Sequence, residues 1–159
     1  MTLTKNLQQA IDNLPCFSSG EQLLAVDDAA GRLDCRLVAL DTMACAFTRL
    51  SLSAPALAGL STDGLKQTAE RLSARLTYLL EPISPIELDS QGCVVQMRST
   101  PPHKDSDRTS YYELLVSRVG ELSLVRYTRV GSEPREVIPA QVTREVLVRL
   151  ASDFAAAAS

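Results

Sequence analysis

The sequence predicts an α+β fold in which a mainly antiparallel sheet, built from a three-strand meander and two hairpins, is packed by three helices. Three segments carry apolar residues at helical spacing, and short alternating runs bounded by turn residues lie between them. No strand–helix–strand repeat is present, which favours antiparallel over parallel pairing. The expected element order is αβββαββββ(β)α. A chain of 159 residues that is 45% hydrophobic fits a single domain over residues 1–159.

The first half predicts one helix followed by the meander. Apolar residues recur at helical spacing from Leu3 to Leu14, with Thr2 or Thr4 available as the N-cap and Pro15 ending the pattern. The strands of the meander are expected at residues 22–26, 33–40 and 45–52.

Two features of the meander could suggest chemistry but have simpler interpretations. The pair Asp27-Asp28 lacks the spaced oxygen ligands of a calcium loop, so it is interpreted as a turn. Cys35 and Cys45 lie on strands and are expected to be buried as small hydrophobic side chains. A disulfide across the two strands is the alternative.

The second helix is the clearest in the chain. The cluster Ser61-Thr62-Asp63 can cap it, and it is expected to run to Pro82. Its apolar stripe is Leu65, Ala69, Leu72, Leu76 and Leu79. The stripe is expected to pack on the domain's own sheet; a coiled-coil seam for a partner is the alternative.

The second half predicts two hairpins, a short strand that could lie at an edge, and a last helix. The strands are expected at 86–88, 93–98, 111–117, 121–127 and 135–138. Residues 99–109 are expected to form an exposed flexible loop. Pro139 is expected to open the last helix, which carries Val142, Val146, Leu150 and Phe154 at intervals of four. The tail at 155–159 is expected to fray.

The composition excludes several classes of function. The chain has one histidine, no tryptophan and four cysteines without ligand spacing, so neither a metal site nor a histidine-based active site is expected. Phosphate-binding and nucleophile motifs are missing, so we predict no cofactor and no enzyme. The single His103 lies in the predicted loop without an orienting carboxylate.

A net charge of −3 argues against binding to nucleic acid. No apolar run suits a signal peptide or membrane span, so a cytoplasmic location is expected.

The second hairpin holds the residues best suited to recognition. The candidate interaction surface consists of Tyr111, Tyr112, Arg118, Arg126, Tyr127 and Arg129. These arginines could meet Arg98 or Arg108 on one face of the sheet and hold an acidic partner; ordinary cross-strand pairing with Glu113 and Glu121 is the alternative. Adjacent tyrosines on a strand point to opposite sides, so one of Tyr111 and Tyr112 is expected in the core.

The order of elements resembles that of class I type III secretion chaperones and the wider group of bacterial proteins sharing their fold. The resemblance runs through the helix Leu3 to Leu14, the meander Leu23 to Leu52, the helix Leu65 to Leu80, the hairpins Ile86 to Tyr127 and the helix Val142 to Phe154. Chaperones of this family have fewer strands between the second and last helices. The resemblance implies a homodimer that binds another protein chain in extended form, without catalysis.

Two functions follow as hypotheses. The first is a non-enzymatic protein-binding, adaptor or chaperone-like domain that acts as a homodimer. The alternative is a small-molecule-binding domain, which could be enzymatic, with a pocket between the helix at 65–80 and the sheet. Tyr112, Arg126 or Met97 would line that pocket. A flat interaction surface favours the first hypothesis, and a concave pocket at those residues favours the second.

Overall fold

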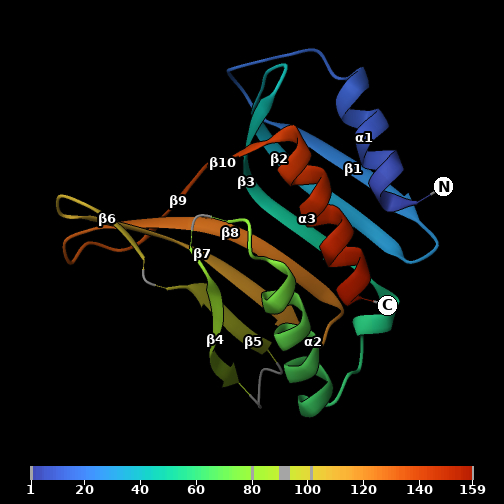
Figure 1. Cartoon of the computed structure of the whole chain (residues 1–159), viewed down its shortest axis with the longest axis vertical. Helices are drawn as coiled ribbons and strands as arrows, with labels where there is room; N and C mark the ends of the chain where they lie inside the picture. The colour runs from blue at the N-terminus through green and yellow to red at the C-terminus, as the bar shows by residue number, and fades with distance from the viewer. Residues whose placement is uncertain (1, 80, 90–93, 101, 159) are drawn as a thin grey trace.

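The computed structural model describes residues 2–79, 81–89, 94–100 and 102–158, and the side chains of 84–89 are not described. This part of the chain contains three α-helices, a short 3-10 helix and ten strands, and it has the α+β fold that the sequence predicts (Figure 1). The helices are α1 (Leu3–Asn13), η1 (Pro55–Leu57), α2 (Thr62–Arg75) and α3 (Arg144–Ala157). The strands are β1 (Gln22–Asp28), β2 (Gly31–Leu40), β3 (Ala44–Ser53), β4 (Ile83–Asp89), β5 (Val94–Ser99), β6 (His103–Asp105), β7 (Arg108–Ser117), β8 (Glu121–Val130), β9 (Glu136–Ile138) and β10 (Ala140–Thr143).

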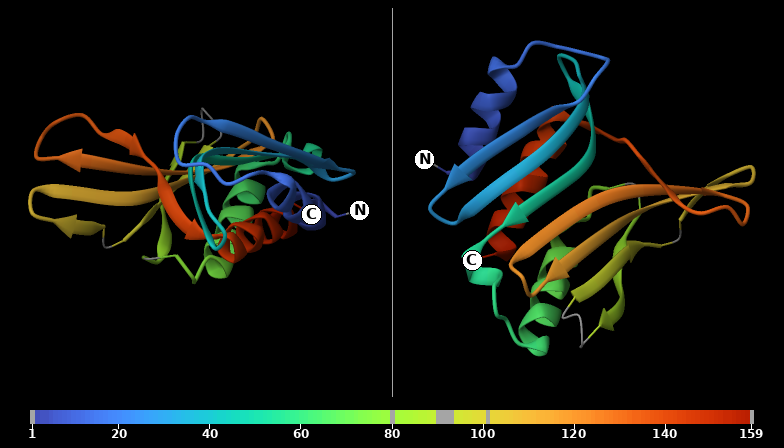
Figure 2. Two further views of the ribbon diagram at one scale, coloured as in Figure 1. Left: turned by 90° about the horizontal axis from the view of Figure 1, so that it is seen from above. Right: turned by 180° about the vertical axis from the view of Figure 1, so that it is seen from behind.

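The strands form one antiparallel sheet with the order β1-β2-β3-β8-β7-β5-β4. Three short strands join it from the side, because β10 pairs with β3, β6 with β7 and β9 with β8. The sheet forks at β3. Residues 50–53 of β3 pair with β8, whereas residues 44–47 pair with β10. Seen from behind, β3 and β8 diverge from this junction (Figure 2, right).

All three α-helices cover the same face of the sheet, as the view from above shows (Figure 2, left). Each helix buries an apolar stripe in the common core, for which Leu7, Leu72 and Phe154 are examples with no exposed surface. The opposite face of the first half of the sheet is polar. It carries the ion pairs Arg32–Asp34 and Arg49–Glu121.

Side-chain caps explain where the helices begin. The N-caps are Thr2, Ser61 and Thr143, whose hydroxyls accept hydrogen bonds from backbone N–H groups three residues later at 3.0–3.2 Å. Asp28 lies at the β1–β2 turn, as the interpretation of the pair Asp27-Asp28 predicts. Its Oδ1 accepts from the N–H groups of Ala30 and Gly31, and its Oδ2 accepts from the N–H of Leu3. One carboxylate therefore closes the β1–β2 turn and anchors the start of α1.

Two helix boundaries differ from the prediction. Helix α2 ends at Arg75 rather than near Pro82, although Leu76 is still buried in the core. Helix α3 begins at Arg144 rather than at Pro139, because residues 140–143 pair with β3 as β10.

Two further segments, at 99–109 and 155–159, also differ from the expectation. The stretch 99–109 is expected to be an exposed flexible loop, but Ser99 is buried at the end of β5, and the exposed residues 103–105 form β6 and pair with the start of β7. The C-terminal tail does not fray at 155–157, which belong to α3, and both Ala157 and Ala158 are buried. The turn of the first hairpin is expected at 89–92; Asp89 ends β4, and residues 90–92 and Cys93 lie outside the described residues.

Cys35 and Cys45 are buried free thiols, which confirms them as small core side chains rather than a disulfide. Burial raises the pKa of both thiols, and that of Cys45 reaches about 11. None of the described helices has the length and apolar character needed to span a membrane.

Candidate functional site

The β7–β8 hairpin presents two chemically different faces. Tyr111 lies opposite Tyr127, and Tyr112 lies opposite Arg126. Because side chains alternate along a strand, the first pair shares the face turned away from the helices and the second pair shares the helix side. The rings of Tyr111 and Tyr127 lie 6.0 Å apart at an angle of 35°. Tyr112 belongs to the core, as expected for one of two adjacent tyrosines.

On the face turned away from the helices, a buried carboxylate organises the polar side chains. Glu113 is only 4% exposed. Arg135 donates to both of its oxygens, from Nη1 to Oε2 at 2.6 Å and from Nη2 to Oε1 at 3.4 Å. Gln96 donates from Nε2 to Oε2 at 2.8 Å, and Nη2 of Arg98 lies 3.7 Å from the same oxygen. The cross-strand interpretation is thus correct for Arg98, which stands opposite Glu113 in the register.

The two tyrosines hold two of these guanidinium groups in place. The Cζ atom of Arg98 lies 4.4 Å from the centre of the Tyr111 ring, and that of Arg135 lies 3.8 Å from the centre of the Tyr127 ring. Arg135 also donates to the hydroxyl of Tyr111 at 3.3 Å. Hydrogen bonding to Glu113 raises the pKa of Arg135 above its ordinary value, so this residue remains charged.

The turn between β8 and β9 encloses this area from one side. Arg129 donates from Nε to the backbone oxygen of Glu133 at 2.9 Å and from Nη2 to that of Ser132 at 3.4 Å. A hollow of about 510 Å³ results, lined by Gln96, Arg98, Tyr111, Arg129, Ser132, Glu133, Pro134 and Arg135. We call these residues, together with Glu113 and Tyr127, the arginine–tyrosine face.

The structure gathers only half of the predicted surface residues at this face. Tyr111, Tyr127 and Arg129 belong to it. Arg118 is exposed at the β7–β8 turn, at the opposite end of the hairpin from Arg129. Arg108 is exposed and pairs with Val130, and it does not line the hollow.

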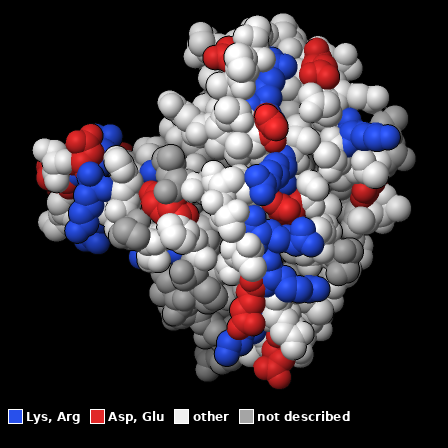
Figure 3. Space-filling view, in the orientation of Figure 1, with Lys and Arg blue, Asp and Glu red and all other residues white. Residues whose placement is uncertain are grey.

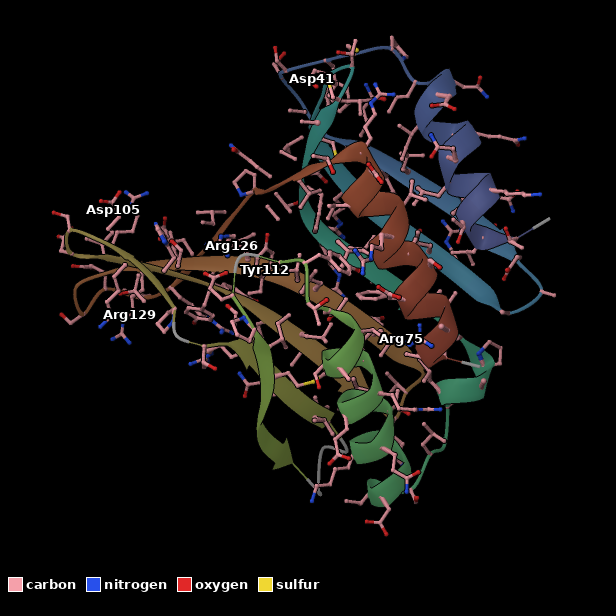
Figure 4. The ribbon with its side chains drawn as sticks, in the orientation of Figure 1. Asp41, Arg75, Asp105, Tyr112, Arg126 and Arg129 are labelled. Atoms are coloured by element: carbon pink, nitrogen blue, oxygen red, sulfur yellow. The ribbon has the colours of Figure 1, made fainter. Side chains whose placement is uncertain are left out.

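Tyr112 and Arg126 lie on the helix side instead, so their assignment to a surface was wrong. Arg126 stacks on the Tyr112 ring at 4.6 Å, and its Nη2 lies 3.5 Å from Oε1 of Glu81. Figure 4 shows Tyr112 and Arg126 close together near the middle of the molecule. Burial raises the pKa of the Tyr112 hydroxyl. Neither oxygen of Glu81 has a hydrogen-bond partner, and neither does Nη1 of Arg126.

The same burial argues against the small-molecule pocket. Met97, Tyr112 and Arg126, which would have lined it, are exposed by 0%, 2% and 7%. Five well-defined hollows on the described part of the chain all lie elsewhere. No group of metal-ligating side chains is present among the described residues, and His103 stands exposed on β6 opposite Ser110.

A second gathering of basic side chains lies on the helix side, as a stripe over α2 and α3 (Figure 3). These arginines connect the two helices. Arg75 pairs with Asp153 at 3.5 Å, and Arg149 stacks on Tyr78 at 4.0 Å. The Tyr78 hydroxyl donates to Asp153 at 2.7 Å, which together with burial raises the pKa of that hydroxyl. The stripe is therefore accounted for by packing within the domain.

Residues that sequence reasoning missed are Gln96 and Arg135. Gln96 is two residues before Arg98 on an alternating strand, so the period of two could have placed both on one face. Arg135 is expected to begin a strand at 135–138, but β9 begins at Glu136, so Arg135 lies just outside the strand, where no periodic pattern shows the direction of a side chain.

No model of a known protein family, no curated protein and no solved structure matches this chain. The function proposed below therefore rests on the geometry of the site and on the resemblance in element order.

Proposed function

We propose that this chain is a non-enzymatic protein-binding domain of adaptor or chaperone-like type, and that its arginine–tyrosine face binds an acidic segment of a partner chain. The observation that carries the proposal is the convergence of Arg98, Arg129 and Arg135 on one hollow. Their three positive charges exceed the negative charge of Glu113 and Glu133. Guanidinium groups recognise carboxylates through paired hydrogen bonds, so an acidic chain complements this surface.

The character of the face suits a peptide rather than a nucleic acid. Arginines of the domain itself already stack on the faces of Tyr111 and Tyr127, so the rings offer little free surface for bases. The fixed planes of the guanidinium groups reduce the entropy lost on binding.

Selection from a displayed library of random peptides tests the proposal. We expect the selected peptides to be rich in aspartate and glutamate and to bind less tightly as salt is added. Arg129→Glu should weaken binding about fivefold, which corresponds to about 1 kcal/mol. The matched control is Arg32→Glu, an exposed arginine on β2 that pairs with Asp34 far from this face. Selection of neutral or basic peptides, or equal effects of the two variants, would argue against an acidic partner.

We also propose a homodimer, as the resemblance to secretion chaperones implies. Light scattering coupled to size-exclusion chromatography should give twice the 17.2 kDa chain mass. A single-chain mass at high concentration would remove this part of the proposal without affecting peptide binding.

A further inference from the structure

The three arginines of the hollow differ in how many of their donors are already used. Arg135 makes three hydrogen bonds, two to Glu113 and one to Tyr111. Arg129 makes two, both to backbone oxygens of the adjoining turn. Arg98 donates no hydrogen bond within the described part of the chain. Its closest partner is Glu113 at 3.7 Å, and its Nε atom is buried without a partner.

A buried N–H group without an acceptor is unfavourable, and such groups in folded proteins usually have a water or a ligand as partner. Arg98 is held with its guanidinium group over the Tyr111 ring, and its side chain remains 36% exposed beside the hollow. The group is therefore oriented in advance and open to an incoming acceptor. Glu113 does not depend on it, because Arg135 and Gln96 already donate to that carboxylate.

The charge of the hollow limits which anion fits. Arg98, Arg129, Arg135 and Glu133 line the hollow, and Arg98 and Arg135 lie beside the buried Glu113, so these five side chains together carry a surplus of one positive charge. One carboxylate neutralises this surplus, whereas a phosphate dianion would leave an unpaired negative charge. A carboxylate also matches the planar fork of arginine.

We propose that Arg98 receives one carboxylate of the partner chain, either from an aspartate or glutamate side chain or from a C-terminus. This inference rests on the proposed function and names the residue that would make its central contact. Arg135 acts as a positioning residue that occupies Glu113 and so leaves Arg98 free to bind the partner.

Nuclear magnetic resonance of the arginine Nε–Hε groups tests this directly in the full chain. The probe is sodium acetate, with sodium chloride at equal ionic strength and inorganic phosphate as comparisons. We expect the Arg98 signal, assigned by its loss in Arg98→Lys, to shift and saturate with acetate, to stay in place with chloride, and to respond more weakly to phosphate. An Arg98 signal that does not move with acetate, or that responds equally to chloride, would overturn the inference.

Two peptides then distinguish the source of the carboxylate. One is an amidated peptide with a single internal glutamate, and the other has a free C-terminus and no acidic side chain. The peptide that shifts the Arg98 signal at the lower concentration identifies the source, and failure of both would count against the inference. Arg98→Lys keeps the positive charge but removes the planar guanidinium group with its paired donors. It should weaken peptide binding about tenfold, whereas Arg32→Gln should leave peptide binding unchanged.

The two proposals fail in different ways. If acidic peptides are selected and depend on Arg129 while the Arg98 signal stays in place, the inference is wrong and the proposed function stands. If no acidic peptide is selected but acetate still shifts the Arg98 signal, the carboxylate site stands and the protein-binding function is wrong. The titration uses the wild-type protein, so it decides the question even if an Arg98 variant fails to fold.

Discussion

Removing one member of the buried Glu81–Arg126 pair should destabilise the protein much more than removing both. Each side chain is only 8% exposed, and the closest nitrogen–oxygen distance is 3.5 Å. Both oxygens of Glu81 and Nη1 of Arg126 have no hydrogen-bond partner. The pair therefore lacks the hydrogen bonds that usually compensate for burying two charges. Each charge is stabilised by the opposite charge of its partner, and substitutions measure how large that contribution is.

The expected magnitudes follow from this burial. Breaking a buried ion pair costs about 3–5 kcal/mol, and Glu81→Leu should cost about 3 kcal/mol because it leaves the guanidinium group of Arg126 buried without an opposite charge. Arg126→Met should cost about 2 kcal/mol, since it leaves the carboxyl group of Glu81 buried without a partner. The double variant loses the stacking of Arg126 on Tyr112, worth about 1–2 kcal/mol. It also removes the buried polar atoms that have no hydrogen-bond partner, so its free energy of unfolding should lie within about 1 kcal/mol of the wild-type value.

Urea unfolding followed by far-ultraviolet circular dichroism measures these differences, since the chain has no tryptophan for fluorescence. The control is Arg32→Met, which removes an exposed partner of Asp34 and should cost less than about 1 kcal/mol. The reasoning is refuted if either single variant costs less than about 1 kcal/mol, or if the cost of the double variant equals the sum of the two.

Two further predictions concern the meander. Gly31→Ala should cost about 1–3 kcal/mol in thermal unfolding, because the added Cβ would lie 2.4 Å from the backbone oxygen of Ser53; Gly64→Ala in α2, with contacts of 3.3 Å or more, should have a much smaller effect. Backbone N–H groups of Ala44 and Met43 lower the pKa of Asp41, so this carboxylate stabilises the β2–β3 turn at neutral pH and loses that effect as the pH falls below about 4. The stability difference between wild type and Asp41→Asn, followed by urea unfolding between neutral pH and the acid limit, should therefore shrink over that range, and a constant difference would contradict the assignment.

Periodicity predicted the elements that bury a continuous apolar face. The stripe from Leu3 to Ile11 identified α1, and alternation identified β2, β3, β7 and β8, because each of these elements packs against the common core. The predicted start of α3 was wrong because a residue of the preceding strand continues the four-residue spacing of the helix. Val142 stands four residues before Val146 and so continued the stripe of α3, yet it pairs with Cys45 in β10. The partner strand β3 lies in the first third of the chain, and the spacing of residues around Val142 does not reveal this long-range pairing.

Elements without an apolar signal were missed for a different reason. Strand β6 consists of exposed polar residues that pair at the side of β7, so its hydrogen bonds are backbone bonds without a hydrophobic pattern. At the site, the alternation of Tyr111 and Tyr112 separated the two faces of the hairpin correctly. Arg135 and Glu81 lie in segments between regular elements, and so their partners Glu113 and Arg126 could be found only in three dimensions.

The fork at β3 has a consequence for how the chain is completed during synthesis. The edge of β3 at residues 44–47 pairs with β10, and α1 packs against α3 as well as against β1, so part of each contact waits until residues 140–157 have been made. Until then, the segment from α1 to β3 has an open strand edge and a helix stripe that β1 covers only in part. Because β10 and α3 complete contacts with β3 and α1, we expect these early and late segments to become native together.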